Sequence, residues 1–275
     1  MFACTRKDRL MTRSGSPYLV LELRDRTGAL PARAFQGADA LAGRFERGDL
    51  VRVRGRVERF RDELSLEVSD IARVGAEDGI DPAQFLPVAY RDLDELDGFL
   101  EHLAGEVYDR GYAMLLRGLL DDGELRAQWR RAPCSRAGHH AYLGGLLEHT
   151  AAVATLAHEA CQLHPGLNSD LLLTAALVHD IGRVREFTYG AEIGLTDEGR
   201  LLGHLVIGEQ MLSERAAGVL DDGRRLALLH CVLCHHGPAS APGGRFASTE
   251  ALALYRLNAV DAGIKGALEH GLGAD

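Results

Sequence analysis

The string ALVHDIGR, residues 176–183, places His179 and Asp180 side by side at the end of an apolar run. Imidazole and carboxylate groups both coordinate metal ions, so the pair has the chemistry of a metal site. The segment 170–179 is apolar on nearly every side, which predicts a helix at the centre of a helical domain. Burying an unpaired carboxylate there would be costly, and Asp180 therefore needs a partner at the end of that helix.

Other groups that can bind metal also stand at or near the ends of apolar helical segments. They are His149, His204, His235, His236 and Asp261. Each of them taken alone is more often a hydrogen-bonded core histidine or a capping acid than a ligand. Taken with His179 and Asp180 they make five histidines and two aspartates on five separate segments. That set is large enough for a metal centre.

The elements that must position these groups follow from periodicity. From Asp92 onward apolar residues recur at steps of three and four, beginning with Leu93, Leu96, Phe99, Leu100 and Leu103. Further helices are predicted at 143–163, 170–180, 199–214, 224–236 and 249–269. Ser169 and Ser248 are the expected N-caps of two of them. The domain that holds the metal-competent residues is therefore predicted to be all-helical.

The first part of the chain has the two-residue period of half-buried strands. In YLVLELRD, Leu19, Leu21 and Leu23 alternate with Tyr18 and other outward residues. In DLVRVRGRVERF the set Val51, Val53 and Val57 is expected to face the core, and ELSLEVSDI repeats the pattern with Leu64, Leu66 and Val68. Short strands separated by Gly/Asp turns predict a small barrel.

The outward side of one predicted strand carries the arginine row Arg52, Arg54 and Arg56. Such a row can track a phosphate backbone, with Tyr18, Phe35 or Phe60 available to stack on bases, and we include Arg33 among the candidate contacts. Most charged strand faces are simply solvated, so the row alone does not establish nucleic-acid binding.

Net charge also differs between the first part of the chain and the rest. Residues 1–75 carry a net charge of +4 and the remaining 200 residues a net charge of −13, out of −9 in all. The stretch GAEDGIDPAQFLP, acidic and rich in Gly and Pro, reads as a linker. We therefore expect a barrel domain over 1–75, a linker over 76–91 and a helical domain over 92–275.

Composition favours a soluble cytoplasmic protein. No apolar stretch is long enough to span a bilayer, and MFACTRKDRLM lacks the apolar core of a secretory signal. Five scattered cysteines do not form a disulfide framework. The string CVLCH, 231–235, matches the pattern for haem attachment. At helical spacing Cys231 and Cys234 are more simply small core residues.

The order H…HD…H…HH…D resembles the HD-domain metal-dependent phosphohydrolase superfamily, which is all-helical. The strings HHAYLGGLLEHT (139–150), LTDEGRLLGHLVIG (195–208) and HHG (235–237), behind a barrel-like segment, resemble more narrowly the YhaM-type 3′→5′ exoribonucleases. The resemblance is strongest over 137–265 and looser over 15–75. It implies an α+β chain in which a small OB-like barrel precedes an HD domain.

Carried over by position, the resemblance makes His149, His179, Asp180 and Asp261 the ligands of one metal ion. In binuclear members Asp180 bridges to a second ion held by His204, His235 and His236. This donor set suits Mn, Fe, Co or Zn, with manganese favoured. Such ions lower the pKa of a bound water and align the oxygens of a phosphodiester. The resemblance makes Asp180 and Arg183 catalytic, and we expect His140 and Arg183 to contact substrate.

Two departures from the family pattern stand out. Arg183 occupies the position where relatives usually have lysine; arginine keeps the positive charge and can clamp a phosphate, but it cannot act as a proton donor. The chain also begins later than the family's barrel usually does, so MFACTRKDRL is expected to supply only part of a first strand and to weaken the barrel.

These observations favour a metal-dependent 3′→5′ exonuclease acting on single-stranded RNA, or on DNA. The barrel would hold the strand and the helical domain would cut it. The alternative is an HD phosphohydrolase of nucleotides or cyclic dinucleotides, with the barrel as a regulatory module. A binding protein with a relict metal site is a third interpretation, against which the full ligand set argues. The expected partner is single-stranded nucleic acid, with no membrane; a homo-oligomer is compatible with the sequence.

Overall fold

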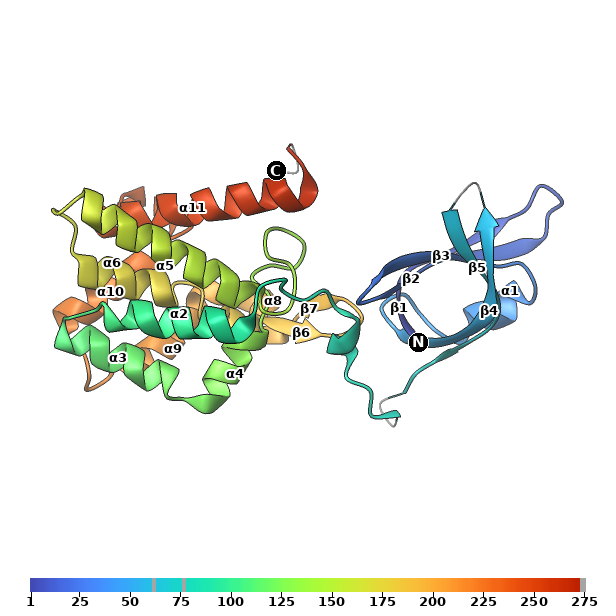
Figure 1. Ribbon diagram of the computed structural model, residues 1–275, viewed down its shortest axis with the longest axis horizontal. Coiled ribbons are helices and arrows are strands. Elements are labelled where there is room, and N and C mark those ends of the chain that lie inside the picture. The colour runs from blue at the N-terminus through green and yellow to red at the C-terminus, as the bar shows by residue number, and fades with distance from the viewer. Residues whose placement is uncertain (61–62, 76–77, 273–275) are drawn as a thin grey trace. The chain divides into compact units, whose positions relative to one another are not determined.

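The computed structural model describes residues 1–60, 63–75 and 78–272 (Figure 1). By its internal contacts the chain divides into two units. The first, here the barrel unit, comprises Met1–Pro87 and Thr188–Gly194; the second, the helical unit, comprises Val88–Phe187 and Leu195–Asp275.

The elements of the first 87 residues are β1 (Phe2–Met11), β2 (Pro17–Asp25), β3 (Gly28–Ala34), α1 (Ala38–Ala42), β4 (Leu50–Phe60), β5 (Glu63–Arg73) and the 3-10 helix η2 (Pro82–Phe85). The helices that follow are α2 (Leu93–Gly105), α3 (Arg110–Leu120), α4 (Gly123–Arg131), α5 (Gly145–Leu163), α6 (Ser169–Val178) and α7 (Arg183–Glu186). A short hairpin of β6 (Phe187–Tyr189) and β7 (Ile193–Leu195) then leads to α8 (Asp197–Leu201), α9 (Gly203–Ala216), α10 (Asp222–Leu233), the 3-10 helices η3 (Pro238–Ser240) and η4 (Pro242–Gly244), and α11 (Thr249–His270).

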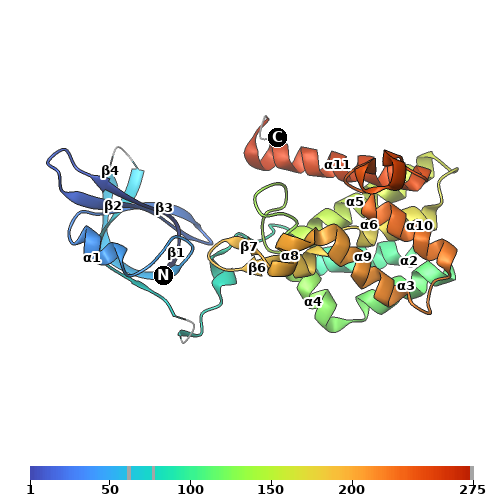
Figure 2. The same cartoon turned by 180° about the vertical axis from the view of Figure 1, so that it is seen from behind.

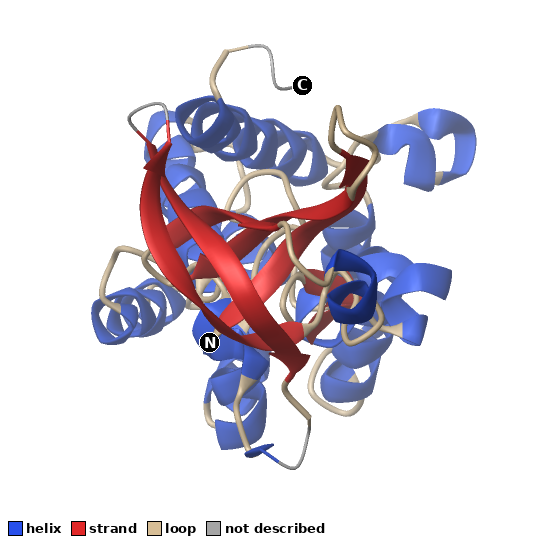
Figure 3. Cartoon of the chain, turned by 90° about the vertical axis from the view of Figure 1, so that its right-hand side faces the viewer, coloured by secondary structure: helices blue, strands red, loops and turns tan. Residues whose placement is uncertain are grey.

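The five long strands form a closed barrel in the order β1-β2-β3-β5-β4 (Figure 3). Neighbouring strands are antiparallel except β3 and β5, and β1 closes the barrel by pairing Phe2 with Val51 and Ala3 with Leu50. Leu19, Leu21 and Leu23 are buried, as their alternation predicts. Closure removes the sheet edges, so the strands can enclose a small apolar core of their own.

The first strand corrects one expectation. β1 spans ten residues and pairs with β2 from Ala3 to Met11, and the barrel closes through it, contrary to the expectation of a weakened barrel. The pairing of β1 with β2 has a register shift between Cys4 and Arg6. The first residues of β1 pair with β4, and most of the strand pairs with β2.

The inward alternation fails at one end of the β4–β5 hairpin. Val57 and Leu64 are each 59% exposed, whereas Leu66 and Val68 are buried as predicted. Within the described residues β5 meets β3 only at Leu66 and Glu67, so the hairpin beyond Leu66 has no sheet neighbour and no core to cover. Periodicity gives the face of a strand but not the point where the core ends.

The helical unit is built around α6. Every residue of this helix from Leu171 to Val178 is buried, which confirms the prediction of a central helix. Helices α5, α10 and α11 pack against it, and α2 and α3 complete its cover. Figure 2 shows α9 and α10 on the face that is turned away in Figure 1.

The predicted helices are present with small shifts at their ends. Ser248 caps α11 by accepting a hydrogen bond from Ala251 N, as expected. Ser169 is not a cap: Asn168 takes that place and accepts from Leu171 N, and Ser169 is the first helical residue. The segment predicted at 199–214 is broken by Gly203, whose φ of 71° separates α8 from α9. No helix in the described part of the chain combines the length and apolarity needed to span a bilayer.

Candidate metal centre

The His179–Asp180 pair directly follows the last residue of α6. Both side chains are buried. His179 Nδ1 lies 2.8 Å from the carbonyl oxygen of Ala176 and must donate to it, which leaves the lone pair of Nε2 free to face inward. The end of a rigid buried helix therefore presents an imidazole nitrogen and a carboxylate in fixed orientations.

Asp180 directs its two oxygens to two different groups of histidines. Oδ1 lies 3.3 Å from His204 Nε2 and 3.3 Å from His235 Nε2. Oδ2 lies 3.6 Å from His179 Nε2 and 3.8 Å from His149 Nε2. The four imidazoles come from α5, the end of α6, α9 and the end of α10, so the helical unit assembles them around one carboxylate.

On the Oδ1 side the donor atoms fit a cation. His235 Nδ1 donates to the Val232 carbonyl over 2.6 Å, so its Nε2 carries a lone pair. This Nε2 and Asp180 Oδ1 are both buried and have no hydrogen-bond partner in the described structure. His204 Nε2 and His236 Nε2 meet at 3.0 Å. A divalent ion among the four would satisfy two buried polar atoms that otherwise cost free energy.

On the Oδ2 side two imidazoles face each other. His149 Nε2 lies 3.2 Å from His179 Nε2, and His149 Nδ1 lies 2.6 Å from Asp261 Oδ2. With Nδ1 donating to Asp261, His149 Nε2 presents its lone pair both to His179 Nε2 and to the amide oxygen of Asn258 at 3.0 Å. A cation at this point would relieve both contacts. In this geometry Asp261 contacts the far nitrogen of His149, the position of a carboxylate that orients a ligand.

Asn258 is part of this arrangement and was not predicted. Its Nδ2 donates to the His235 carbonyl over 3.2 Å, which turns its Oδ1 toward His149 Nε2 at 3.0 Å. Its proximity in sequence to Asp261, one turn away on the same helix, is the signal that places it on the face toward the site.

Arg183 contacts Asp180 rather than open solvent. Its Nε lies 2.8 Å from Asp180 Oδ2, and its Nη1 donates to Glu186 Oε2 over 3.1 Å. Glu186 in turn accepts from the backbone N–H of His204 over 3.2 Å and lies 3.4 Å from His204 Nδ1. Glu186 thus connects Arg183 to the histidine of α9, a role that sequence reasoning did not assign to it.

A buried thiol completes the surroundings of Asp180. Cys134 is fully buried, and its Sγ donates to Asp180 Oδ2 over 3.5 Å. Cys231 and Cys234 are also buried in the helical core, as their spacing predicts. Only Cys134 of these three contacts the carboxylate.

Glycine at position 182 allows the segment after Asp180 to lie close to the backbone of α9. A Cβ on Gly182 would lie 2.1 Å from the His204 carbonyl oxygen and 2.5 Å from Gly208 N. Such distances are impossible for a real side chain, so the segment after Asp180 packs directly on the backbone of α9. That contact fixes His204 relative to the His179–Asp180 pair.

The protonation states suit metal coordination. Burial lowers the pKa of His236 to about 3 and the pKa of His179 well below its usual value, so both imidazoles are neutral near pH 7. Burial opposes ionisation of Asp180, but the permanent charge of the Arg183 guanidinium beside it holds the pKa of this carboxyl well below the usual range. Neutral imidazoles around a charged carboxylate are the forms that bind a cation.

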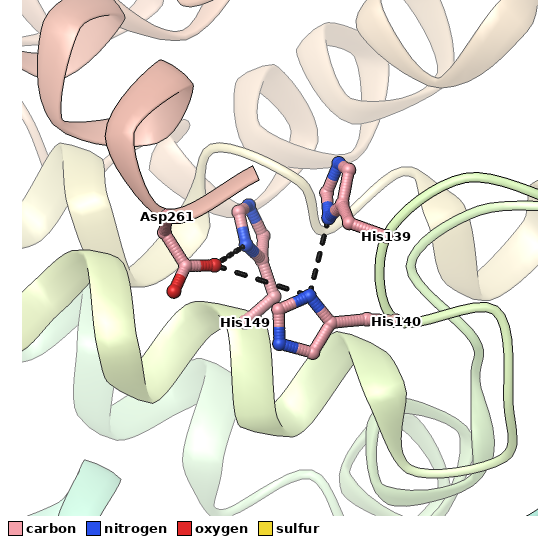
Figure 4. Close-up of side chains that lie close together, drawn as sticks. All are labelled: His139, His140, His149 and Asp261. Atoms are coloured by element: carbon pink, nitrogen blue, oxygen red, sulfur yellow. Dashed lines mark hydrogen bonds and ion pairs between the residues drawn. The ribbon is translucent and has the colours of Figure 1, made fainter. Parts of the chain in front are cut away.

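His140, predicted to contact substrate, lies in a neighbouring cluster with His139, His149 and Asp261 (Figure 4). His139 Nδ1 and His140 Nδ1 are 3.1 Å apart, and His140 Nδ1 is 3.9 Å from Asp261 Oδ2. Burial lowers the pKa of His139 to about 4 and that of His140 to about 3.

The predicted contacts on the barrel fall in two separate places, one on the neighbouring strands β2 and β3 and one on β4. On β2 the ring of Tyr18 stacks on Phe35 with centroids 5.4 Å apart, and Arg33 lies on the adjacent β3. Arg52 and Arg54 lie on β4, which is not a neighbour of either strand in the barrel. Arg52 pairs with Asp78 at 3.2 Å, and Arg54 is exposed. The side chain of Phe60, the third predicted platform, is outside the described residues.

Comparison with known families agrees with this architecture. Residues 146–263 match the HD domain, and residues 4–74 match the OB-fold nucleic acid binding domain. The chain is therefore a two-domain hydrolytic enzyme in which an OB-fold precedes a helical HD domain that carries clustered His and Asp candidates for divalent metal.

Its relatives are more specific. A protein of Bacillus subtilis named 3′-5′ exoribonuclease YhaM is 28% identical over 227 residues, which cover 82% of this chain and 72% of that protein. The protein of the same name from Listeria monocytogenes is 27% identical over 225 residues, covering 82% of this chain and 71% of that one. Among solved structures, the HD domain of the L. monocytogenes phosphodiesterase PgpH matches with a TM-score of 0.33 and 21% identity, over 52% of this chain and 74% of that chain.

Proposed function

We propose that this enzyme is a metal-dependent 3′→5′ exoribonuclease that hydrolyses the phosphodiester bonds of single-stranded RNA. The observation that carries the proposal is the placement of Asp180, whose Oδ1 and Oδ2 face separate groups of histidines at 3.3–3.8 Å. A carboxylate shared in this way suits two ions side by side, and an ion pair is well matched to phosphodiester hydrolysis. The exoribonuclease relatives support the substrate class.

Two groups of residues would hold the ions. His149, His179 and Asp180 would hold the first, and Asp180, His204, His235 and His236 the second. The resemblance also assigns Asp261 to the first ion; in this geometry its carboxylate orients His149 from the far nitrogen. Manganese is the ion we favour, with iron, cobalt and zinc compatible with the same donors. The ions would supply Lewis acidity toward the scissile phosphate.

The chain's own residues have distinct tasks. Arg183 would place a permanent positive charge beside Asp180, where it balances two carboxylates and attracts a phosphate oxygen. Because an arginine does not release its proton, this residue would stabilise charge and would not serve as an acid. Glu186 would keep the histidine of α9 in place through its contacts with His204.

The barrel unit would bind the strand. The stacked rings of Tyr18 and Phe35 offer an aromatic surface for bases, and Arg33, Arg52 and Arg54 offer positive charge for phosphates. Since Arg52 and Arg54 lie on β4, apart from the ring pair and Arg33 at β2 and β3, we propose that the RNA strand contacts two different parts of the barrel. The OB-fold match supports nucleic acid as the ligand. A cytoplasmic setting suits this substrate and the free thiols of all five cysteines.

The test is an end-labelled RNA ladder. Single-stranded RNA labelled at its 5′ end is incubated with the purified protein and Mn²⁺, beside single-stranded DNA and a cyclic dinucleotide. The expected result is a progressive ladder of shorter labelled RNAs that disappears with Asp180→Asn. Intact RNA together with hydrolysis of the cyclic dinucleotide would overturn the proposal in favour of a nucleotide phosphohydrolase.

A further inference from the structure

The C-terminal helix α11 turns an apolar side away from the helical unit. Its exposed residues between 252 and 268 recur at steps of three and four, so they share one side of the helix. They are Leu252, Arg256, Ala259, Val260, Gly263, Ile264 and Leu268, here called the outer face. Arg256 is the one charged residue in this set. Ile264 is 60% exposed and Leu268 79%.

The charged residues in the second half of α11 point to the opposite side. Lys265 Nζ lies 3.1 Å from Glu148 Oε1 of α5, and Asp261 Oδ2 lies 2.6 Å from His149 Nδ1. Glu269 accepts a hydrogen bond over 3.0 Å from a backbone N–H in the loop before α5. A surface helix normally turns its charges to water and its apolar residues to the core. This part of α11 has the reverse polarity.

Other helices cover α11 on one side only. It packs on α5, α6 and α10, and in Figures 1 and 2 these helices lie below it while no other labelled helix lies above it. A continuous apolar patch that remains in water marks an interaction surface more often than a patch of scattered residues does. The outer face is therefore a candidate for contact with another molecule.

An apolar groove extends the outer face at the N-terminal end of α11. The groove has a volume of about 640 Å³ and lies between this helix and the end of α5. Leu163, Leu167, Leu252 and Ala253 are among the residues that line it. Because Leu252 belongs to both the groove and the outer face, the two form one apolar surface.

Two glycines in α11 have no explanation inside the chain. A Cβ on Gly263 or on Gly266 would meet no atom of the described residues within 4 Å. Glycine in the interior of a helix costs about 0.8–1.0 kcal/mol relative to alanine. Internal packing does not require that cost at either position. The missing side chain of Gly263 leaves a notch in the outer face, where another backbone can approach closely.

We propose that the outer face of α11 binds the same face of a second copy of this chain, in an antiparallel pair with two-fold symmetry. The face is self-complementary because it has a bulky row beside a small row. The bulky row is Val260, Ile264 and Leu268, and the small row is Ala259, Gly263 and Ala267. A two-fold axis near Gly263 lets the bulky row of each copy pack into the small row of the other.

Charge favours a second copy over other occupants. In an antiparallel pair centred on Gly263, Arg256 of one copy lies beside the C-terminal end of α11 in the other. The negative end of a helix dipole stabilises a cation there. Nucleic acid would need several cations, and this face offers one. An anionic lipid surface would be repelled by the net charge of −13 carried by residues 76–275.

The same pairing fills the groove. Leu272, which is 97% exposed, lies nine residues beyond the axis and would face Leu254 of the second copy, next to Leu252 and Ala253 of its groove. The 22 residues of α11 make a helix about 33 Å long and about 11 Å wide, or roughly 360 Å² on each copy before the groove is counted. This area is at the low end for a specific interface, so we expect a reversible dimer that dissociates at micromolar concentrations.

Sedimentation velocity of the full-length protein tests the proposal. Over a hundredfold range of micromolar concentrations, wild type should show a monomer–dimer equilibrium. Ile264→Glu should weaken the dimer Kd at least a hundredfold, because it places a charge in the interface. Leu226→Glu is the matched control, since Leu226 on α10 is also 60% exposed but lies outside the outer face. Its Kd should equal that of wild type.

A cross-link tests the position of the axis. Oxidised Gly263→Cys should form a covalent dimer on a non-reducing gel, whereas Leu226→Cys should give only the background of wild type. If Ile264→Glu unfolds by circular dichroism, this cross-link carries the test. A wild type that stays monomeric throughout, or a dimer that Ile264→Glu leaves unchanged, would overturn the proposal. A monomer that floats with vesicles of phosphatidylglycerol and phosphatidylcholine would also overturn it and would assign the face to a membrane. RNA cleavage does not enter these measurements, so the proposed function can fail independently.

Discussion

Arg183→Ala removes a cation that lies between two buried carboxylates. Arg183 Nε is 2.8 Å from Asp180 Oδ2 and its Nη1 is 3.1 Å from Glu186 Oε2, and all three residues are buried. Alanine leaves both acids without this partner in a place that water does not reach. We therefore expect the metal-free variant to be strongly destabilised.

The size of the effect follows from burial. Removing one partner of a buried ion pair costs about 3–5 kcal/mol. For a chain of this size each kcal/mol lowers Tm by about 2–4 °C, so a fall on the order of 10 °C is expected. Arg185→Ala is the matched control on the same short helix. The side chains of Arg185 and Glu198 are 46% and 28% exposed, and loss of such a surface pair costs less than about 1 kcal/mol.

The assay combines thermal unfolding of chelator-treated protein with metal content and turnover. With Mn²⁺ saturating, Arg183→Ala should turn over RNA about 10²-fold more slowly, the scale of losing one preorganised charge. Its metal content should match wild type, because arginine has no lone pair to coordinate. Arg183→Lys, which keeps the charge, should retain most activity. An Arg183→Ala variant with the same Tm as the Arg185→Ala control would refute the buried-pair argument. Full activity with a lowered Tm would show that Arg183 stabilises the fold and has no part in turnover.

Four further outcomes are expected. Asp180→Asn should lower metal content as measured by elemental analysis, and equal content in wild type and variant would exclude Asp180 as a ligand. Arg52→Ala with Arg54→Ala should reduce the slope of log K against log salt by about 1–2 for long RNA, with dinucleotide cleavage unchanged; an equal loss on both substrates would remove the barrel from binding. Gly182→Ala should displace α9 and lower metal content, since its Cβ would lie 2.1 Å from a backbone oxygen; a variant that crystallises with α9 unmoved would contradict this. Burial lowers the pKa of His139 from 6.5 to about 4. The unfolded state then binds more protons at this position between these values, so His139 alone should lower metal-free stability by about 1–2 kcal/mol from pH 7 to pH 5. Chemical denaturation at each pH should therefore show a fall that is smaller by this amount in His139→Gln than in wild type.

The main lines of the fold and part of the site were accessible from sequence because they depend on spacing. The apolar run before His179 predicts a buried helix, and α6 is one. The arrangement of His204, His235 and Asp180 around a common point is in accord with the order of the residues along the chain, since a helical domain brings helix ends together. The barrel follows from alternation in β2 and β5.

Other features depend on atoms rather than on spacing. Glu186 contacts the backbone N–H of His204, and Asn258 contacts Nε2 of His149. These atomic contacts have no counterpart in the periodicity of the sequence. Cys134 is remote from Asp180 in sequence and meets it only in the folded chain. The alternation of apolar and charged residues in β4 predicts a buried Val57, but a strand can extend beyond the core that it covers, and Val57 is exposed.

One carboxylate that serves two groups of ligands makes their occupancies thermodynamically linked. Asp180 has a single negative charge to share between its Oδ1 side and its Oδ2 side. If both groups hold ions as proposed, the ion that arrives second would meet a carboxylate already coordinated and a neighbouring charge of the same sign, so its intrinsic affinity would be lower than that of the first. By reciprocity the first ion to leave is held more weakly by the same factor, whichever side it occupies. For the two ions proposed at Asp180, a metal titration should therefore show two unequal steps with a populated half-loaded form between them. The free ion concentration, rather than the amount of protein, would then set how much of the enzyme carries a complete pair.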